Sequence, residues 1–579
     1  MEAVESKTVR VNAGPSPAGT EGWSANRSSI LLVLLTLACL LPFAGRAFHV
    51  DDPLFLWAAQ HITKEPLNPY GFQLIWDTGR VGMAEVTKNP PLACYYAAVV
   101  GAISGWSELA MHLGFLLPTL ALVLGVYRLA RRFTTLPLVA ALAALLTPGL
   151  LVSASSVMCD TPMLALWVWA SIFWIEGLTP ARPPYLVLSG LLIAGSALTK
   201  YFGVSLIPLL AIYAFARQRK LGTWVWYLLI PVAALAGFQL WTRSLYGQGL
   251  FLGAARFSAS ERSAIDQGSL LVKGLVGLSF AGGCALSALT LAPLAWARKK
   301  VLIAATGSLA VAVVLALGWL SLGSSPQAAQ VMQALHGRWP VVSVELAFCI
   351  AGGVSVLALA ISDWWQRKDA DSLFLALWVL GTFLFAGFLN WTTNARSILP
   401  LIPAVGILLA RRLETMRTDL GHRFRVRVAA ALVISGAVSL WVAAGDAGLA
   451  NSAREAAVYL TRQTRNQAGT LWFEGHWGFQ YYMERLGARA VDVTDPRYAA
   501  GDLVIVPQNN IQVFPIPRDV VASSQAIEID LHQHVTTIRW ELGAGFYSSF
   551  WGPLPFSAGT IPAERYYLLR IGNGARSMP

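Results

Sequence analysis

Long apolar runs alternate with short polar connections over most of the 579-residue chain. A helix needs roughly 20 mostly apolar residues to cross a bilayer. Thirteen runs approach that length and predict membrane-spanning helices near residues 30–47, 108–129, 134–152, 161–177, 185–199, 201–216, 223–241, 270–296, 301–321, 342–362, 372–389, 397–410 and 428–446. A further apolar segment, Pro91–Ser104, is a candidate fourteenth span.

The positions of Lys and Arg orient these spans, because short cytoplasmic loops are enriched in basic residues. The basic loops fall on one side only if Pro91–Ser104 dips into the interface without crossing. This side then holds Arg128, Arg131, Arg132, Arg182, Arg217, Arg219, Lys220, Arg298, Lys299, Lys300, Arg367, Lys368, Arg411, Arg412, Arg417, Arg423, Arg425 and Arg427. The pattern predicts a protein of the cytoplasmic (inner) membrane, with a cytoplasmic N-terminus and a periplasmic or other extracytoplasmic C-terminus.

Composition supports this class and excludes others. Only 13% of the residues are charged and 55% are hydrophobic, whereas soluble domains carry about 25% charged residues. A soluble enzyme, a disordered chain and a secreted disulfide scaffold are therefore excluded. The net charge of +12 follows from topology and does not indicate nucleic acid. The five cysteines lie in or beside apolar runs without a CxxC spacing, so they predict neither a disulfide framework nor a cysteine-built metal site.

The polar stretches divide the chain into three parts. Residues 1–28 predict a disordered cytoplasmic tail, although a cleaved signal peptide over 1–47 is an alternative. Residues 29–447 predict the transmembrane domain, with outer loops at 46–107 and 242–269. Residues 448–579 predict a small soluble α/β domain, in which Asp502–Val506 and Tyr566–Ile571 read as strands. The fold class predicted is thus an all-α polytopic membrane protein with a C-terminal α/β domain.

Charged residues that end up near a bilayer usually face a cavity or a partner, so they are the candidates for chemistry. On the predicted outer side these are Asp51, Asp52, Lys88, Asp160, Lys200, Arg256 and Arg396. A carboxylate beside a hydroxyl acts as a general base, and cations beside a phosphate stabilise a departing anion. The set suits transfer of a group from a lipid phosphate to a hydroxyl, and the chain has no GxxxxGK[ST] nucleotide motif.

Each candidate also has a purely structural interpretation. Asp51 and Asp52 suit a helix cap, Lys88 suits an interfacial lysine and Arg256 suits the surface of a loop helix. Asp160 is harder to explain in this way, because an acid between apolar segments needs a cation or a cavity. A transporter or flippase of a lipid-linked glycan, or a scaffold with a binding domain, would share this topology. Transporters place charges near mid-span, whereas these charges lie at span ends.

The order of the motifs resembles the GT-C glycosyltransferases of the protein O-mannosyltransferase and lipid A aminoarabinose transferase type. The matching segments run from the acidic pair after the first span to a basic motif before the twelfth: Asp51-Asp52, Lys88-Asn89-Pro90-Pro91-Leu92, Val157-Met158-Cys159-Asp160-Thr161-Pro162, Ala197-Leu198-Thr199-Lys200-Tyr201-Phe202, Ala255-Arg256-Phe257 and Arg396-Ser397-Ile398-Leu399-Pro400.

The resemblance implies the GT-C fold and a polyprenyl-phosphate-linked sugar donor used outside the cytoplasm on a glycolipid, polysaccharide or protein hydroxyl. It implies that Asp51 is the catalytic residue of the acidic pair, that Lys88 and Arg256 hold the lipid phosphate, and that Asp160 and Lys200 line the cavity. Arg396 is a weaker phosphate candidate, and Asp52 would orient the acceptor or the loop. The aminoarabinose transferases carry an acid before the lysine and a His in the second outer loop, associated with a metal. Thr87 and the His-free segment 242–269 depart from this pattern, which weighs against a bound metal, and no other cofactor is predicted.

Overall fold

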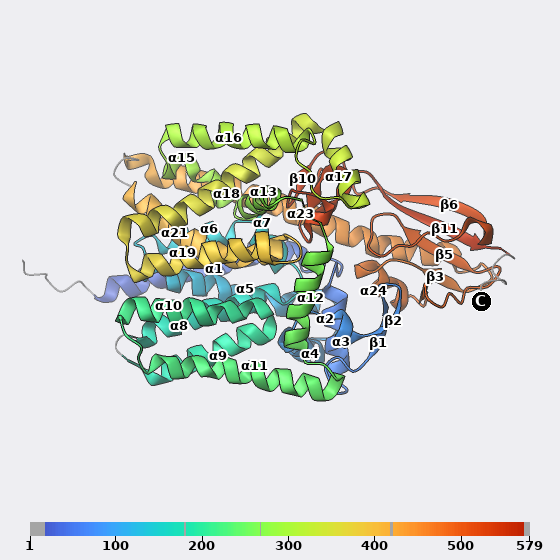
Figure 1. The fold of residues 1–579 in the computed structure, drawn as a ribbon, viewed down its shortest axis with the longest axis horizontal. Helices are drawn as coiled ribbons and strands as arrows, with labels where there is room; N and C mark the ends of the chain where they lie inside the picture. The colour runs from blue at the N-terminus through green and yellow to red at the C-terminus, as the bar shows by residue number, and fades with distance from the viewer. Residues whose placement is uncertain (1–17, 179–180, 267, 417–420, 573–579) are drawn as a thin grey trace, which may run out of the picture.

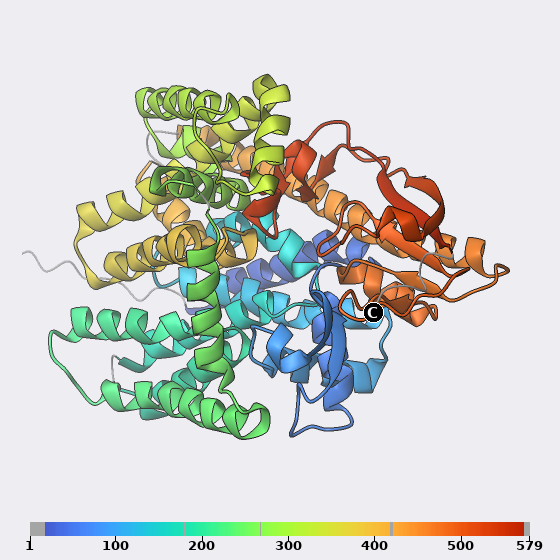
Figure 2. The same ribbon diagram turned by 45° about the vertical axis from the view of Figure 1, so that its right-hand side comes forward.

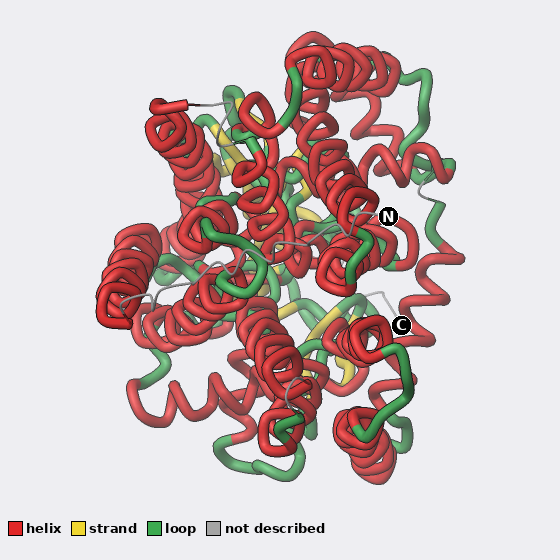
Figure 3. The backbone as a smooth tube through the Cα atoms, turned by 90° about the vertical axis from the view of Figure 1, so that its left-hand side faces the viewer, coloured by secondary structure: helices red, strands yellow, loops and turns green. Residues whose placement is uncertain are grey.

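The computed structural model describes residues 18–178, 181–266, 268–416 and 421–572. A bundle of helices forms one end of the molecule, and a β-sheet region built from the C-terminal part forms the other (Figure 1). Viewed from the bundle end, many helices point toward the reader and the strands lie behind them (Figure 3). Residues 1–17 of the predicted disordered tail lie outside the described part. Helix α1 (Ala18–Leu40) begins within the rest of that tail.

Within the described residues, nine helical segments are long and apolar enough to cross a membrane: Asn26–Phe43 in α1 and η1, α5 (Glu108–Ala130), α8 (Asp160–Leu178), Tyr201–Gln218 (η2 with α10), α11 (Trp224–Tyr246), α16 (Arg298–Ala316), α18 (Trp339–Arg367), Ala370–Leu389 (α19 with the π-turn η3) and α23 (Phe424–Thr464). Helices α6 (Pro137–Leu145) and α7 (Pro148–Ala154) make a tenth span if counted together, although they are bent by 65°. Pro148 begins α7 and the Thr147 side chain caps it, which explains the break. The protein is therefore an integral multi-pass membrane protein.

The thirteen spans predicted exceed the nine or ten that length and composition support in the described residues. The remaining three runs are helical but short. Helix α9 (Pro183–Thr199) has 17 residues, and α13 (Leu270–Cys284) ends before the four-residue helices α14 (Ser287–Thr290) and α15 (Ala292–Ala295). The third, predicted at 397–410, is broken by prolines into α20 (Ala395–Ile398), η4 (Leu399–Leu401) and α21 (Ile402–Thr415).

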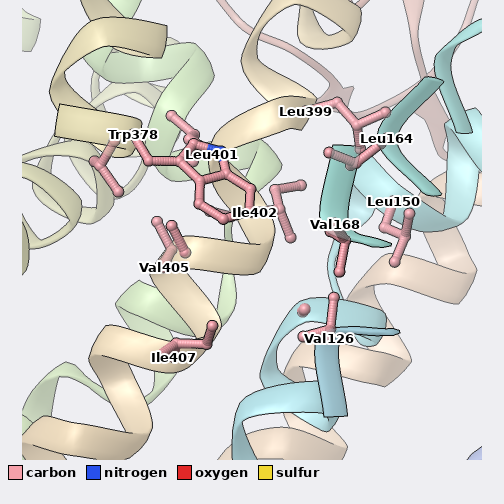
Figure 4. Close-up of a cluster of buried hydrophobic side chains, with 14 of the residues drawn as sticks. Val126, Leu150, Leu164, Val168, Trp378, Leu399, Leu401, Ile402, Val405 and Ile407 are labelled. Carbon is pink, nitrogen blue, oxygen red and sulfur yellow. The ribbon is translucent and has the colours of Figure 1, made fainter. Parts of the chain in front are cut away.

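Close packing holds the centre of the bundle together. Trp378 of α19 lies against Ile402 and Val405 of α21, with Val168 of α8 and Leu150 of α7 on the opposite side (Figure 4). All five are 2% exposed or less. Trp378 also donates a hydrogen bond of 2.7 Å to the carbonyl of Pro400, beside the break that precedes α21. In a membrane, dispersion and hydrogen bonds of this kind hold helices together, because lipid tails are as apolar as the side chains.

Both predicted outer loops form ordered structure at the sheet end of the bundle. The first contains α2 (Asp52–Ile62), the hairpin of β1 (Gln73–Trp76) and β2 (Gly79–Gly82), α3 (Met83–Val86) and α4 (Leu92–Ser104). Helix α4 is a short apolar helix of 13 residues. The second contains α12 (Leu250–Ala264), which runs across the direction of the bundle helices (Figures 1 and 2). Helix α17 (Pro326–Gly337) follows α16.

The C-terminal part contains a five-stranded mixed sheet in the order β4-β3-β5-β11-β6. Its strands are β3 (Leu471–Phe473), β4 (Arg489–Ala490), β5 (Leu503–Pro507), β6 (Val521–Ile529) and β11 (Glu564–Ile571), and α24 (Trp477–Arg485) connects β3 to β4. The two strands predicted from sequence correspond to β5 and β11, which pair antiparallel with Val504 opposite Leu569. Four two-residue strands form separate small pairings: β7 (Val535–Thr536), β8 (Ile538–Arg539), β9 (Ala544–Gly545) and β10 (Ser557–Ala558).

The predicted boundary between the membrane and soluble parts, at 447/448, falls inside α23. This helix has 41 residues and continues to Thr464 without interruption. The sheet therefore begins only after the membrane helix has run well beyond its apolar portion.

Candidate active site

The acidic pair is held by a strained turn at the start of α2. Val50 has φ +48°, a left-handed conformation that is rare for a β-branched residue. Both oxygens of Asp52 accept backbone hydrogen bonds, from the N–H of His49 at 2.8 Å and of Val157 at 2.9 Å. Asp52 is fully buried, and burial raises the pKa of its carboxyl to about 6. Asp52 thus ties the turn to the segment before α8, whereas the Asp51 side chain keeps 31% of its exposure.

Four of the predicted site residues form one chain of ion pairs. Nη1 of Arg396 lies 2.6 Å from Oδ2 of Asp51, and its Nε lies 2.9 Å from Oδ2 of Asp160. Nζ of Lys200 lies 2.5 Å from the other oxygen of Asp160. The four residues come from the start of α2, the start of α8, the end of α9 and α20. The structure therefore brings four of the seven predicted site residues into direct contact.

A large cavity of about 1190 Å³ opens beside this chain. Asp51, Lys88, Asn89, Lys200 and Arg396 line its polar part. A second part is apolar and runs between α8, η2 with α10, and α19, where it is lined by Trp167, Phe202, Leu209, Leu377, Trp378 and Phe385. Asp160 is 1% exposed and lies behind the lining, where it holds the two cations in place.

Lys88 and Arg256, the two predicted phosphate ligands, are not brought together. Lys88 lines the cavity, lies over the ring of Phe257 at 4.5 Å from the centroid, and donates a hydrogen bond to the carbonyl of Glu85. Burial lowers the pKa of the Lys88 ammonium. Arg256 is exposed on α12 and is not among the lining residues. On α12 it is the neighbouring Phe257 that faces Lys88.

Sequence reasoning did not single out several residues of the cavity. Trp76 and Asp77 come from the hairpin, Glu261 from α12, and Gln512 and Tyr547 from the C-terminal part. Acids, amides and aromatic residues are common in loops, so no local pattern separated these from their neighbours. Among the C-terminal residues, His476 lies against this region, because its ring stacks on Trp76 with 4.4 Å between the ring centroids.

A second buried network connects the C-terminal part to the turn before Asp51. Nη1 of Arg46 lies 2.9 Å from Oδ2 of Asp446 in α23 and donates to the hydroxyl of Ser155 at 2.8 Å. Asp446 also accepts hydrogen bonds from Thr537 at 2.5 Å and from Tyr547 at 3.0 Å. The backbone carbonyl of Phe546 accepts from the N–H of Ala395 at 2.8 Å. The residue next to Arg396 is thereby fastened to the C-terminal part.

In the described part of the chain, no group of three or more His, Cys, Asp and Glu side chains is arranged to hold a metal ion. Whether the protein uses a metal therefore stays a prediction from the sequence.

Residues 88–241 match the family model described as dolichyl-phosphate-mannose-protein mannosyltransferase. No curated protein matches the chain. Among solved structures, similar chains include the oligosaccharyltransferase AglB from Archaeoglobus fulgidus, at 14% identity and a TM-score of 0.46, covering 81% of this chain and 64% of AglB. ArnT from Cupriavidus metallidurans has 14% identity and a TM-score of 0.39, covering 85% of this chain and 94% of ArnT. The arabinofuranosyltransferase AftD from Mycobacteria has 13% identity and a TM-score of 0.40, covering 98% of this chain and 40% of AftD.

These identities and TM-scores are too low to carry a substrate or a residue role from those structures to this chain. The family match is independent of them and includes Lys88, Asp160 and Lys200. Residues 88–241 are thus similar to the dolichyl-phosphate-mannose-protein mannosyltransferase family, which confirms the resemblance to GT-C glycosyltransferases that the order of motifs indicates.

Proposed function

We propose that the protein is an inverting membrane glycosyltransferase. It transfers a sugar from a polyprenyl phosphate to a hydroxyl acceptor on the non-cytoplasmic side, with Asp51 as general base. The observation that carries this proposal is the single cavity in which a partly exposed carboxylate, three cations and a long apolar wall meet.

The two parts of the cavity fit the two ends of such a donor. The apolar part between α8, α10 and α19 accommodates an isoprenoid chain, and Lys88 lies where the polar part begins. No carboxylate of the described residues lies within ion-pair distance of Lys88, so its ammonium is available for a phosphate. The family match, whose description names a dolichyl-phosphate sugar, supports the same donor class.

The proposed reaction needs one proton transfer. Asp51 takes the proton of the acceptor hydroxyl, whose oxygen then attacks the anomeric carbon from the face opposite the phosphate. The bond between the anomeric carbon and the phosphate oxygen breaks, and its electron pair stays on the polyprenyl phosphate. Arg396 holds Oδ2 of Asp51 in position, and Lys88 stabilises the phosphate as charge develops on it.

Binding of undecaprenyl phosphate, followed by native mass spectrometry of the purified protein, tests the donor site. Lys88→Ala is expected to weaken binding by about tenfold or more, since one charge-assisted contact is lost. Arg256→Ala is the matched control, because it removes a cation of the same outer region that does not line the cavity. Equal binding by the wild type and Lys88→Ala would contradict the donor assignment.

Catalysis is tested by the release of sugar from a panel of undecaprenyl-phosphate sugars, with water as the acceptor. Asp51→Asn keeps the shape of the side chain but cannot accept the proton, so release is expected to fall by about 100-fold or more while lipid binding persists. Wild-type turnover by Asp51→Asn would exclude Asp51 as the base.

A further inference from the structure

The cavity has an outer mouth that the donor does not account for. We define this mouth by Trp76 and Asp77 of the hairpin, Glu85, Lys88, Glu261 of α12 and Gln512 of the C-terminal part, all of which line the cavity. Three segments far apart in sequence therefore build it. Gln512 donates a hydrogen bond to the carboxylate of Asp77, and this bond joins the hairpin to the C-terminal part at the edge of the mouth.

The charge of the mouth is uneven. Asp77, Glu85 and Glu261 act electrostatically on the ammonium of Lys88, yet none of the three forms an ion pair in the described part of the chain. Lys88 is the one cation among the residues that define the mouth. Once a lipid phosphate engages Lys88, three carboxylates and the phosphate itself surround whatever enters next.

Two further features describe what the mouth can hold. Trp76 is only 8% exposed but lines the cavity, and its indole stacks on His476, which holds the ring in place beside the cavity. Carboxylate and amide oxygens accept hydrogen bonds from hydroxyl groups without needing a charge on the partner.

We infer that the outer mouth is the acceptor subsite and that the acceptor is an uncharged glycan. Its hydroxyl groups bond to Asp77, Glu85, Glu261 and Gln512, and one of its sugar rings packs on Trp76. An acceptor with a phosphate near the reacting hydroxyl is repelled by the carboxylates. This inference rests on the proposed function and specifies its acceptor class.

The test uses protein in neutral nanodiscs preloaded with undecaprenyl phosphate, so that Lys88 is engaged. Binding is measured by saturation-transfer NMR for uncharged hexose and pentose oligosaccharides, and for the same oligosaccharides carrying one phosphate. The phosphorylated forms are expected to bind about tenfold more weakly at low ionic strength, with the difference shrinking as salt is added.

Further variants locate the effect. The double variant Glu85→Gln, Glu261→Gln is expected to remove most of the discrimination against phosphate, whereas Glu455→Gln, an exposed carboxylate of α23 outside the cavity lining, leaves it unchanged. Trp76→Ala is expected to weaken binding of the uncharged glycan at least about fivefold without changing the bound undecaprenyl phosphate.

The possible outcomes separate this inference from the proposed function. Equal or tighter binding of the phosphorylated glycans would overturn the inference, and so would the absence of any glycan binding by protein that holds undecaprenyl phosphate. In both cases the donor assignment would stand. Failure of the wild type to bind undecaprenyl phosphate would overturn the proposed function, and the inference with it.

Discussion

At the scale of single residues, Asp160 joins the two cations of the ionic chain beside the cavity. Its two oxygens bind Lys200 and Arg396 separately, and it is 1% exposed. Arg396 in turn holds Asp51. Asp160 does not line the cavity, yet its carboxylate positions two of the lining cations and, through Arg396, the proposed base Asp51.

Replacing Asp160 by Asn is expected to lower the free energy of unfolding by about 3 kcal/mol or more, because it leaves Lys200 and Arg396 with one buried counter-charge fewer. Thermal unfolding in detergent measures this loss. Glu176→Gln is the control, since the pair of Glu176 with Arg128 has side chains 35% and 45% exposed, and such pairs contribute less than about 1 kcal/mol. Equal losses in the two variants would show that the buried pairs of Asp160 stabilise the protein no more than an exposed pair does.

The other acid of the pair, Asp52, predicts a dependence of stability on pH. Burial raises its folded-state pKa to about 6, above the unfolded value of about 3.9. The folded state then binds the proton more tightly, so this contribution to stability is complete below about pH 4 and is lost as the pH rises through 6. The loss is of the order of 3 kcal/mol. Asp52→Asn does not titrate, so the Tm of the wild type minus the Tm of the variant is expected to fall between about pH 4.5 and about pH 7.5. A constant difference would contradict the raised pKa.

At the scale of elements, α23 connects the bundle to the C-terminal part, and one glycine lets α23 and β7 approach each other closely. A Cβ atom at Gly445 would lie 2.5 Å from the carbonyl oxygen of Val535 in β7. Gly445→Ala is therefore expected to destabilise the protein by about 1–3 kcal/mol. Gly237→Ala in α11 meets nothing within 4 Å, and its effect is expected to be neutral or stabilising by up to about 1 kcal/mol. Thermal unfolding of both variants decides the point, and an unchanged Tm for Gly445→Ala would show that α23 and β7 separate easily.

At the scale of the whole molecule, the sequence predicts the helices and the main strands better than it predicts the contacts between them. Each apolar run corresponds to helix, and the charges at span ends do meet, because both follow from the cost of placing polar groups in lipid. The number of full spans could not be read in the same way, since Pro400 and Pro403 break an apolar run without changing its hydropathy. The sequence also could not show which side of α12 faces the cavity, and therefore could not show that Arg256 lies on the other side.

The sequence also did not reveal where α23 ends or which C-terminal residues line the cavity. Residues after 447 become polar, with Arg454, Glu455 and Arg462, so composition changes where the helix does not. Tyr547 and Gln512 reach the cavity through tertiary contacts with Asp446 and Asp77. Contacts between segments so distant in sequence leave no local pattern.

The hairpin and the C-terminal part are expected to open as one unit. The carbonyl of Thr78 accepts a hydrogen bond of 2.8 Å from the N–H of Val493, and Oδ2 of Asp492 accepts one of 3.3 Å from the backbone N–H of Arg80. Asp492 also holds its own turn through the N–H and hydroxyl of Thr494. Asp492→Ala removes all of these side-chain contacts at once, so backbone amides on both sides lose protection together.

Hydrogen exchange measured by mass spectrometry is the suitable readout, because exchange reports local opening without requiring global unfolding. Peptides covering residues 73–82 and 491–497 are expected to exchange at least about threefold faster in Asp492→Ala, whereas peptides from α8 and α21 keep their rates. Asp495→Ala is the control, since Asp495 pairs with Arg497 through side chains that are 60% and 77% exposed. Faster exchange in residues 491–497 alone would mean that the hairpin keeps its place without Asp492, held by its other contacts with the C-terminal part such as the hydrogen bond from Gln512 to Asp77.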